Sequence, residues 1–375
     1  MDKYLILENG VSFKGKSFGY DGEAIGELVF TTKTTGYLET LSDPAYYGQI
    51  VLQTFPLIGN YGVITEDFGP GPMHLKAYIV RQWCQEPSNF RCEGNLDSFL
   101  CDHKIPGLYD IDTRALTRVI RENGTMNAML SDEPELTKEQ RDKLKAFKIG
   151  DAVAAVCAES NYSPGNYGES GNCKGGYHPS AGEHKPIKSA FLPLQVAMWD
   201  FGDGFRSAEL LLKYGCNPIT INHNAPAGGL LNKKPDGIYL TGGPGDPSGY
   251  KRITDEIKRL IKKDYNVPIL AVGLGHQMLA IANGAKTEKL RFGHRGTNQP
   301  VKECNSNRAF VTNQNHGYVV TDESLPDWVV KSYVNINDGT NEGIDYMNVP
   351  AISVQFEPTK QVMERFIDMM KKGGK

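Results

Sequence analysis

Short apolar runs separated by turn residues dominate the first 150 residues of the chain, a pattern typical of strands. Three such runs are Tyr4–Leu7, Gly26–Thr32 and Gln49–Thr54. Three further segments show a helical pattern, at residues 73–84, 113–122 and 136–146. These patterns predict a β-rich N-terminal α/β domain over residues 1–150.

Strand and helix patterns alternate in the second half of the chain. Strands are expected at 194–200, 218–222, 237–241, 268–272, 309–312, 329–334, 342–345 and 351–356. Helices are expected at 207–214, 253–263, 276–283 and 361–371. Alternation of this kind favours a parallel sheet with helices on both faces. We therefore expect a doubly wound, mostly parallel sheet over residues 189–375.

The two regions are separated by a segment of different composition. Residues 161–188 are rich in glycine, serine, proline and asparagine, which favours an exposed connection over a packed core. We interpret residues 151–188 as a linker or flexible loop. A chain of 375 residues is long enough for two domains.

Composition excludes several classes of function. The formal net charge is −3 and the charges are interspersed, so the chain has no basic footprint for nucleic acid or for a membrane surface. No apolar run approaches the roughly 20 residues of a membrane span, and the first residues do not resemble a signal peptide. We expect a cytoplasmic protein. The seven cysteines and eight histidines show no zinc-site spacing, so no metal is expected.

The segment Val267–Gly284 predicts a buried strand, a tight turn and a helix, with Gly273 at the apex of the turn. Small residues flank this apex, as they do in a nucleophile elbow, where the turn lifts one side chain clear of the sheet. Here the apex residue has no side chain.

Two other segments belong with the elbow. Thr241–Pro247 is a glycine-rich turn after an apolar strand, where backbone N–H groups can hold an oxyanion. Gln314–Tyr318 is a polar cluster expected to follow a strand that ends at Asn313.

In this order the three motifs resemble the class I glutamine amidotransferase domain. The resemblance extends to the small subunit of carbamoyl-phosphate synthetase through four further segments, Thr35–Tyr46, Ser88–Phe90, Ile111–Arg118 and Phe292–Val301. It covers nearly the whole chain and fails mainly between residues 155 and 188 and near the C-terminus.

The resemblance implies a division of labour between two subunits. In the family, the small subunit hydrolyses glutamine through a Cys-His-Glu triad. The large subunit uses the ammonia, bicarbonate and two ATP to make carbamoyl phosphate for arginine and pyrimidine synthesis. It follows that ATP and magnesium belong to the large subunit, that this chain needs no cofactor, and that a large subunit is its expected partner.

The chain departs from the family at each catalytic position. Gly273 stands at the nucleophile, Glu357 at the histidine and Thr359 at the glutamate. Gly204 and Arg206 also replace the family's lysine and asparagine. So many losses indicate drift after selection for glutaminase activity relaxed, and predict that this half-reaction is lost.

By the same resemblance, a set of residues would surround glutamine. They are Ala45, where the family commonly has serine, and Gly243, Gly245, Leu274, Gln277, Asn315, Gly317 and Tyr318. Three interpretations remain open. The chain is an inactive regulatory or structural subunit, an active amidohydrolase rebuilt around Glu357 and a water molecule, or a free-standing glutamine-binding pseudoenzyme. The sequence leaves open whether glutamine binds and whether a partner exists.

Overall fold

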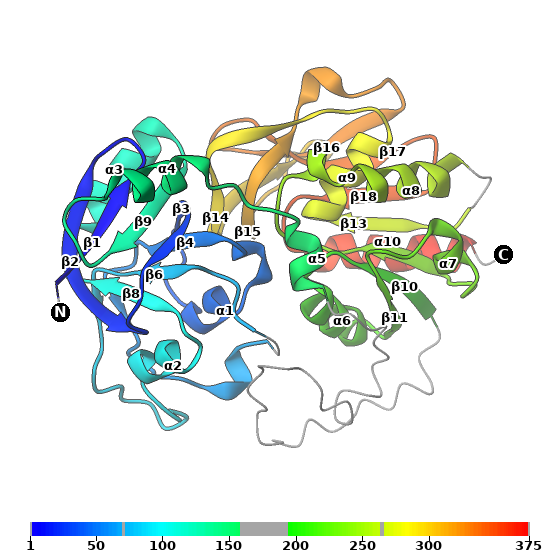
Figure 1. Cartoon of the computed structure of the whole chain (residues 1–375). Coiled ribbons are helices and arrows are strands. Elements are labelled where there is room, and N and C mark those ends of the chain that lie inside the picture. The colour runs from blue at the N-terminus through cyan, green and yellow to red at the C-terminus, as the bar shows by residue number, and fades with distance from the viewer. Residues whose placement is uncertain (1, 70–71, 158–193, 263–265, 374–375) are drawn as a thin grey trace. The chain divides into compact units, whose positions relative to one another are not determined.

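A computed structural model (Figure 1) describes residues 2–69, 72–157, 194–262 and 266–373. Most of the expected linker, from residue 158 to residue 188, lies outside these residues. The described chain divides into two compact units. The N-terminal unit contains residues up to 152 together with 290–297, and the C-terminal unit contains the remaining described residues.

A closed seven-stranded barrel forms the centre of the N-terminal unit. Its strands are β1 (Asp2–Leu7), β2 (Ser12–Gly19), β3 (Ala24–Thr31), β4 (Gln49–Gln53), β6 (Ala77–Ile79), β8 (Pro106–Tyr109) and β9 (Met126–Ser131). They follow the order β1-β2-β8-β6-β4-β3-β9. The neighbours β3, β4, β6 and β8 run parallel, and the other pairs are antiparallel.

Helices and short elements surround the barrel. They are α1 (Tyr37–Leu41), η1 (Pro44–Tyr46), β5 (Leu57–Ile58), β7 (Gln82–Trp83), α2 (Leu96–Asp102), α3 (Thr113–Asn123) and α4 (Lys138–Ala146). Successive residues of β3 point to opposite faces. Leu28 and Phe30 pack in one cluster with Leu116 of α3, whereas Val29 packs in another with Leu38 of α1. Both faces of β3 are therefore covered.

The helix predicted at residues 73–84 is wrong. Ala77–Ile79 forms strand β6 between β4 and β8, and Gln82–Trp83 forms β7. Residues 77–80 are buried without interruption, and a short continuous apolar run does not distinguish a buried strand from a helix. Pairing with two distant strands decided the outcome.

The C-terminal unit is built on a nine-stranded sheet, in the order β11-β10-β12-β13-β18-β17-β16-β14-β15. Its strands are β10 (Leu194–Asp200), β11 (Cys216–Asn222), β12 (Gly237–Leu240), β13 (Ile269–Val272), β14 (Thr287–Glu303), β15 (Ala309–Val320), β16 (Val329–Asn335), β17 (Asn341–Tyr346) and β18 (Ala351–Val354). The five strands β11, β10, β12, β13 and β18 are parallel, and β17, β16 and β14 continue antiparallel. The expected mostly parallel fold is confirmed.

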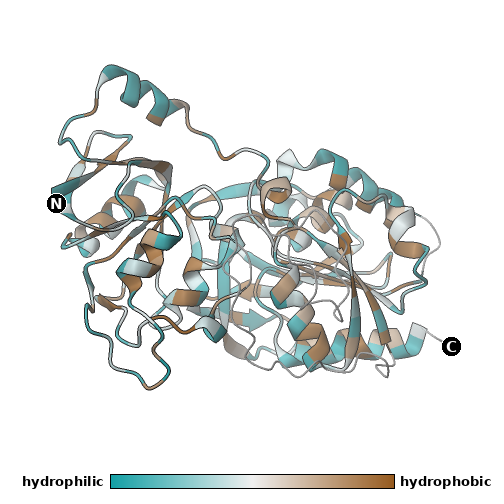
Figure 2. Ribbon diagram, turned by 60° about the horizontal axis from the view of Figure 1, so that its bottom comes forward, coloured by the Kyte–Doolittle hydropathy of each residue, from teal (hydrophilic) through white to brown (hydrophobic). Residues whose placement is uncertain are grey.

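Helices cover both faces of the parallel part of the sheet. They are α5 (Ala152–Val156), α6 (Gly204–Lys213), α7 (Ala227–Leu231), α8 (Lys251–Lys262), α9 (Leu274–Ala282) and α10 (Lys360–Gly373). Ala197 and Trp199 of β10 share a core cluster with α8 and α9. Val196 and Met198 share another with α6 and α10. Figure 2 shows the matching pattern, with hydrophobic strands and helices of mixed hydropathy.

The sequence did not predict the full extent of β15 and did not predict β14. Gln314–Tyr318, expected to follow a strand, lies inside β15, and the 17-residue strand β14 was not predicted at all. Both strands carry many polar residues. In β15, the buried Gln314 and His316 hydrogen-bond to each other, and this pairing of buried polar groups is not visible as hydrophobic periodicity.

No helix among the residues that the structure describes is both long enough and apolar enough to cross a membrane.

Candidate functional site

The elbow predicted at Gly273 is present between β13 and α9. Gly273 has φ 54° and ψ −114°, a conformation that residues with a side chain rarely adopt. Its N–H donates to Val354 O of β18 at 2.9 Å, and its carbonyl accepts from Gln277 N at 3.2 Å. The apex is thus fixed to the sheet on one side and to the helix on the other.

The space at the apex is open. Among the residues that the structure describes, a Cβ placed on Gly273 would have one neighbouring atom within 4 Å, Gly242 Cα at 3.4 Å. Gly275 differs, because a Cβ there would lie 2.6 Å from Leu240 O and 2.8 Å from Thr241 O. Glycine at 275 lets α9 start against the end of β12, whereas glycine at 273 leaves room for a side chain.

The glycine-rich turn after β12 lies against the elbow. A Cβ on Gly243 would overlap Phe201 O and would lie 3.2 Å from Leu274 Cδ2. Gly245 has φ 96°, and a Cβ there would overlap the Tyr250 hydroxyl. The structure therefore places the turn at Gly243 against Leu274. A close approach to the backbone of Phe201 requires glycine at 243, and the positive φ and the Tyr250 side chain favour glycine at 245.

Gln277 joins α9 to the ends of two strands. Its Nε2 donates to Tyr318 O of β15 at 2.8 Å and to Gln355 Oε1, just after β18, at 2.9 Å. The side chain is 3% exposed. Because both protons of this amide nitrogen are engaged, Gln277 holds strand ends together. Asn315 and Gly317 are half-buried on the same segment of β15.

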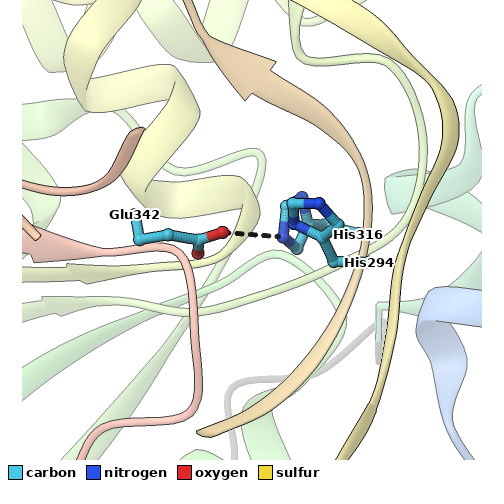
Figure 3. A group of neighbouring side chains, drawn as sticks. All are labelled: His294, His316 and Glu342. Carbon is cyan, nitrogen blue, oxygen red and sulfur yellow. Dashed lines mark ion pairs between the residues drawn. The ribbon is translucent and has the colours of Figure 1, made fainter. Parts of the chain in front are cut away.

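Two buried histidines border the elbow. His276 Nδ1 lies 2.7 Å from Ser353 Oγ, and complete burial lowers the pKa of His276 from 6.5 to about 3, so the ring is neutral. His316 on β15 contacts Tyr318 O and Gln314 Oε1, and its Nε2 lies 3.9 Å from Glu342 Oε1 (Figure 3).

Glu357 and Thr359 lie beyond β18 and take part in local contacts. Asn313 Nδ2 donates to Glu357 Oε2 at 2.8 Å, and Glu357 N donates to Asn313 O at 3.0 Å. Thr359 precedes α10, where its Oγ1 accepts from Val362 N at 3.5 Å and its carbonyl accepts from Met363 N at 3.0 Å. Glu357 joins the segment after β18 to the interior of β15, and Thr359 caps α10.

Comparisons with known proteins cover nearly the whole chain. Residues 5–130 match the family described as "Carbamoyl-phosphate synthase small chain, CPSase domain", and residues 197–372 match "Glutamine amidotransferase class-I". The carbamoyl phosphate synthase small chain of Clostridium perfringens is 42% identical, with 96% of this chain and 94% of that protein covered. The small chain of Syntrophotalea carbinolica is 38% identical, with 99% and 98% covered.

The chain belongs to the carbamoyl phosphate synthase small-chain family. The resemblance seen in the motifs is thereby confirmed, as is the glutamine amidotransferase character of the C-terminal unit.

Ala45 of this small chain belongs to the N-terminal unit, where it is part of η1. Its N–H donates to Asp43 Oδ1 at 3.0 Å, which fixes the turn. Gly204, in the C-terminal unit, lies at the start of α6. A Cβ there would be 2.5 Å from Asp200 Oδ2, so the buried Asp200 carboxylate occupies the space a larger residue would need. Burial raises the pKa of Asp200, and N–H donors from Gly202 and Gly204 oppose that shift.

Sequence reasoning missed the residues that hold the small chain's site in place. They are Asn313, Gln355 and Glu342, each of which contacts a site residue from a distant part of the sequence. Asn313 and Glu357 are 44 positions apart, and Gln277 and Gln355 are 78 apart. Only strand order brings such pairs together, and no local pattern signals them.

Proposed function

We propose that this small chain has lost glutamine hydrolysis. We further propose that it serves as a non-catalytic subunit, which docks on a carbamoyl phosphate synthase large chain that uses free ammonia. By docking, the small chain would stabilise or activate the large chain. The observation that carries the proposal is Gly273, which occupies an intact elbow apex with an open space where a nucleophile would project.

Hydrolysis of a carboxamide by this route needs a nucleophile, a base that accepts and returns its proton, and a group that orients the base. Glycine supplies no nucleophile. Glu357 offers a carboxylate, which is a much weaker base than an imidazole, and its Oε2 is engaged by Asn313. Thr359 caps α10 and carries no negative charge. The chemistry fails at all three positions.

The alternative of an active site rebuilt around Glu357 and water has less support. Residues 269–280 contain no serine, threonine or cysteine that could replace the nucleophile. A water molecule would need a base near the elbow to activate it. This alternative relies on Glu357 as that base, and Glu357 Oε2 is already engaged by Asn313.

Glutamine binding without hydrolysis is a second candidate function, favoured by the preserved turn beside the elbow. We propose that the N–H groups of Gly243 and Leu274 face the carboxamide oxygen. The other proposed glutamine-facing residues are Ala45, Gly245, Gln277, Asn315, Gly317 and Tyr318. This function is compatible with the first, because a bound but unreacted ligand can stabilise a subunit.

Several broader proposals follow from family membership. The subunit would act in the cytoplasm, within a heteromer devoted to pyrimidine and arginine biosynthesis. Residues 1–150 would form the domain that contacts the large chain, 151–188 a linker, and 189–375 the amidotransferase-like domain. ATP and magnesium would bind to the large chain.

The subunit role is tested with the large chain purified alone and together with this chain. We expect the two to copurify, and we expect ammonium-dependent carbamoyl phosphate synthesis, or its thermal half-life, to rise when this chain is present. Failure to copurify, with no change in rate or half-life, would contradict the proposal.

The loss of chemistry is tested by rebuilding the triad. We expect no ammonia release from Gly273→Cys, because position 357 still lacks an imidazole. The triple variant Gly273→Cys, Glu357→His, Thr359→Glu is the matched comparison, and Gly273→Ala controls for the added Cβ. Turnover restored by the single Gly273→Cys change would refute the argument that several catalytic groups were lost together.

A further inference from the structure

A chain of hydrogen bonds along β15 determines how one amide is oriented. Thr312 Oγ1 donates to Gln299 O at 3.0 Å. A hydroxyl has one proton, so Thr312 must accept in its second contact, which is with Gln314 Nε2 at 3.0 Å. Gln314 therefore directs its NH₂ group to Thr312 and its carbonyl oxygen to the next partner, His316.

This orientation determines the protons on His316. Its Nε2 lies 3.0 Å from Gln314 Oε1 and its Nδ1 lies 2.9 Å from Tyr318 O. Both partners are carbonyl oxygens, which accept hydrogen bonds and never donate them. Both hydrogen bonds can form together only if each ring nitrogen carries a proton, that is, if the ring is the positively charged imidazolium.

A buried charge of this kind requires a counter-charge nearby. His316 is 8% exposed, and the completely buried Glu342 of β17 lies 3.9 Å away, measured from Oε1 to Nε2 (Figure 3). Asn335 Nδ2 donates to the same Glu342 oxygen at 3.2 Å and so fixes the carboxylate. The pair lies within the C-terminal unit and joins β15 to β17 and β16.

The Glu342–His316 pair is linked to the helix that follows the elbow through the carbonyl of Tyr318. Tyr318 O accepts from His316 Nδ1 and also from Gln277 Nε2. Gln277 lies on α9, one turn after Gly273. The path Glu342–His316–Tyr318–Gln277 therefore connects a completely buried acid to the helix that begins at the elbow.

We infer that Glu342 is a positioning residue: it holds His316 as an imidazolium, and His316 fixes the β15 segment Asn315–Tyr318 against Gln277. The inference deepens the proposed function, on which it rests for the claim that this segment faces glutamine. Glu342 itself touches no reacting atom.

The test uses the full-length chain labelled with ¹⁵N-histidine, at neutral pH. The His316 signals are identified by their loss in His316→Gln. In the wild type we expect both ring nitrogens in the protonated range of long-range ¹H–¹⁵N correlation spectra. A neutral ring in the wild type overturns the inference, and this result needs no variant to fold.

Matched variants separate the effect of the Glu342 charge on His316 from the effect of the Glu342 side-chain shape. Glu342→Gln removes the charge and should convert His316 to a neutral ring, whereas Glu342→Asp should preserve the imidazolium. The same Glu→Gln change at the exposed Glu364 of α10 is the control and should alter nothing. The double variant Glu342→Gln, Gln314→Glu places a carboxylate next to His316 Nε2 from position 314 and should restore the imidazolium. An imidazolium that persists in Glu342→Gln alone would contradict the positioning role.

A second readout follows the path to Gln277. The side-chain amide signals of Gln277 should move in Glu342→Gln and stay in place in Glu364→Gln. Signals that do not move in Glu342→Gln would overturn the positioning claim. Calorimetric titration with glutamine is recorded on the same samples. Absence of glutamine binding in the wild type would count against the second candidate function, while the His316 spectrum continues to report on Glu342 independently.

Discussion

Gly273 and His276 lie one turn apart at the start of α9, and their surroundings differ sharply. Gly273 has a backbone conformation that costs of order 1–3 kcal/mol for residues with a side chain, and it has open space around it. His276 is completely buried, with Nδ1 bound to Ser353. The first residue keeps the geometry of a catalytic turn, whereas the second packs α9 against β18.

The burial of His276 predicts a dependence of stability on pH. The pKa of His276 is about 3 in the folded chain, against 6.5 for a free side chain. Below about pH 6.5 the unfolded chain therefore binds a proton that the folded chain does not bind, so stability falls as the pH is lowered towards about 3. One proton corresponds to a slope of at most about 1.4 kcal/mol per pH unit.

The measurement is urea unfolding at several pH values across this window, for the wild type and His276→Asn. Carboxylates titrate in both proteins and cancel in the difference. We expect the free energy of unfolding of the wild type to fall more steeply with decreasing pH. Equal slopes would show that His276 is not held neutral by burial.

At the element scale, Gly273 and Thr359 have different structural surroundings. The elbow at Gly273 is fixed by β13, β18 and α9, whereas Thr359 directly precedes α10 and caps it. That helix buries Val362, Met363, Phe366 and Met370 against the sheet. Under the proposed function, Thr359 contributes to the stability of this helix and not to catalysis.

The cap that Thr359 provides predicts a modest and specific loss of stability when its hydroxyl is removed. Thr359→Ala removes the hydroxyl that accepts from Val362 N, and we expect unfolding to become easier by about 0.5–1 kcal/mol, the lower part of the usual range for a helix cap, because the contact is long at 3.5 Å. Thr359→Ser keeps the hydroxyl and should stay within about 0.5 kcal/mol of the wild type. Thermal unfolding of both variants checks this, and equal losses would contradict a capping role.

Local patterns predicted most elements of the C-terminal unit because its strands are apolar and its helices amphipathic. These local patterns failed where pairing with distant strands determines the secondary structure. Within the helix predicted at residues 73–84, Ala77–Ile79 forms β6 through pairing with β4 and β8, and β14 and β15 are strands despite many polar residues. The elbow was predictable because small residues at fixed spacing define it. The Glu342–His316 pair was not, because strand order alone brings these residues together.

At the scale of the whole molecule, the chain keeps the small-chain family along nearly its full length while its elbow carries no nucleophile. The matches to the small-chain and amidotransferase families cover residues 5–130 and 197–372. Retention of both parts, beside a glycine at the apex of the elbow, is the combination that the proposed docking and regulatory role predicts.

The most direct test of this account is the release of ammonia from glutamine by the purified wild-type chain, alone and with a large chain. Carbamoyl phosphate synthesis from ammonium in the same preparation shows that the complex is intact. We predict no ammonia above the enzyme-free background in either case. Sustained turnover that scales with the amount of chain would contradict the account.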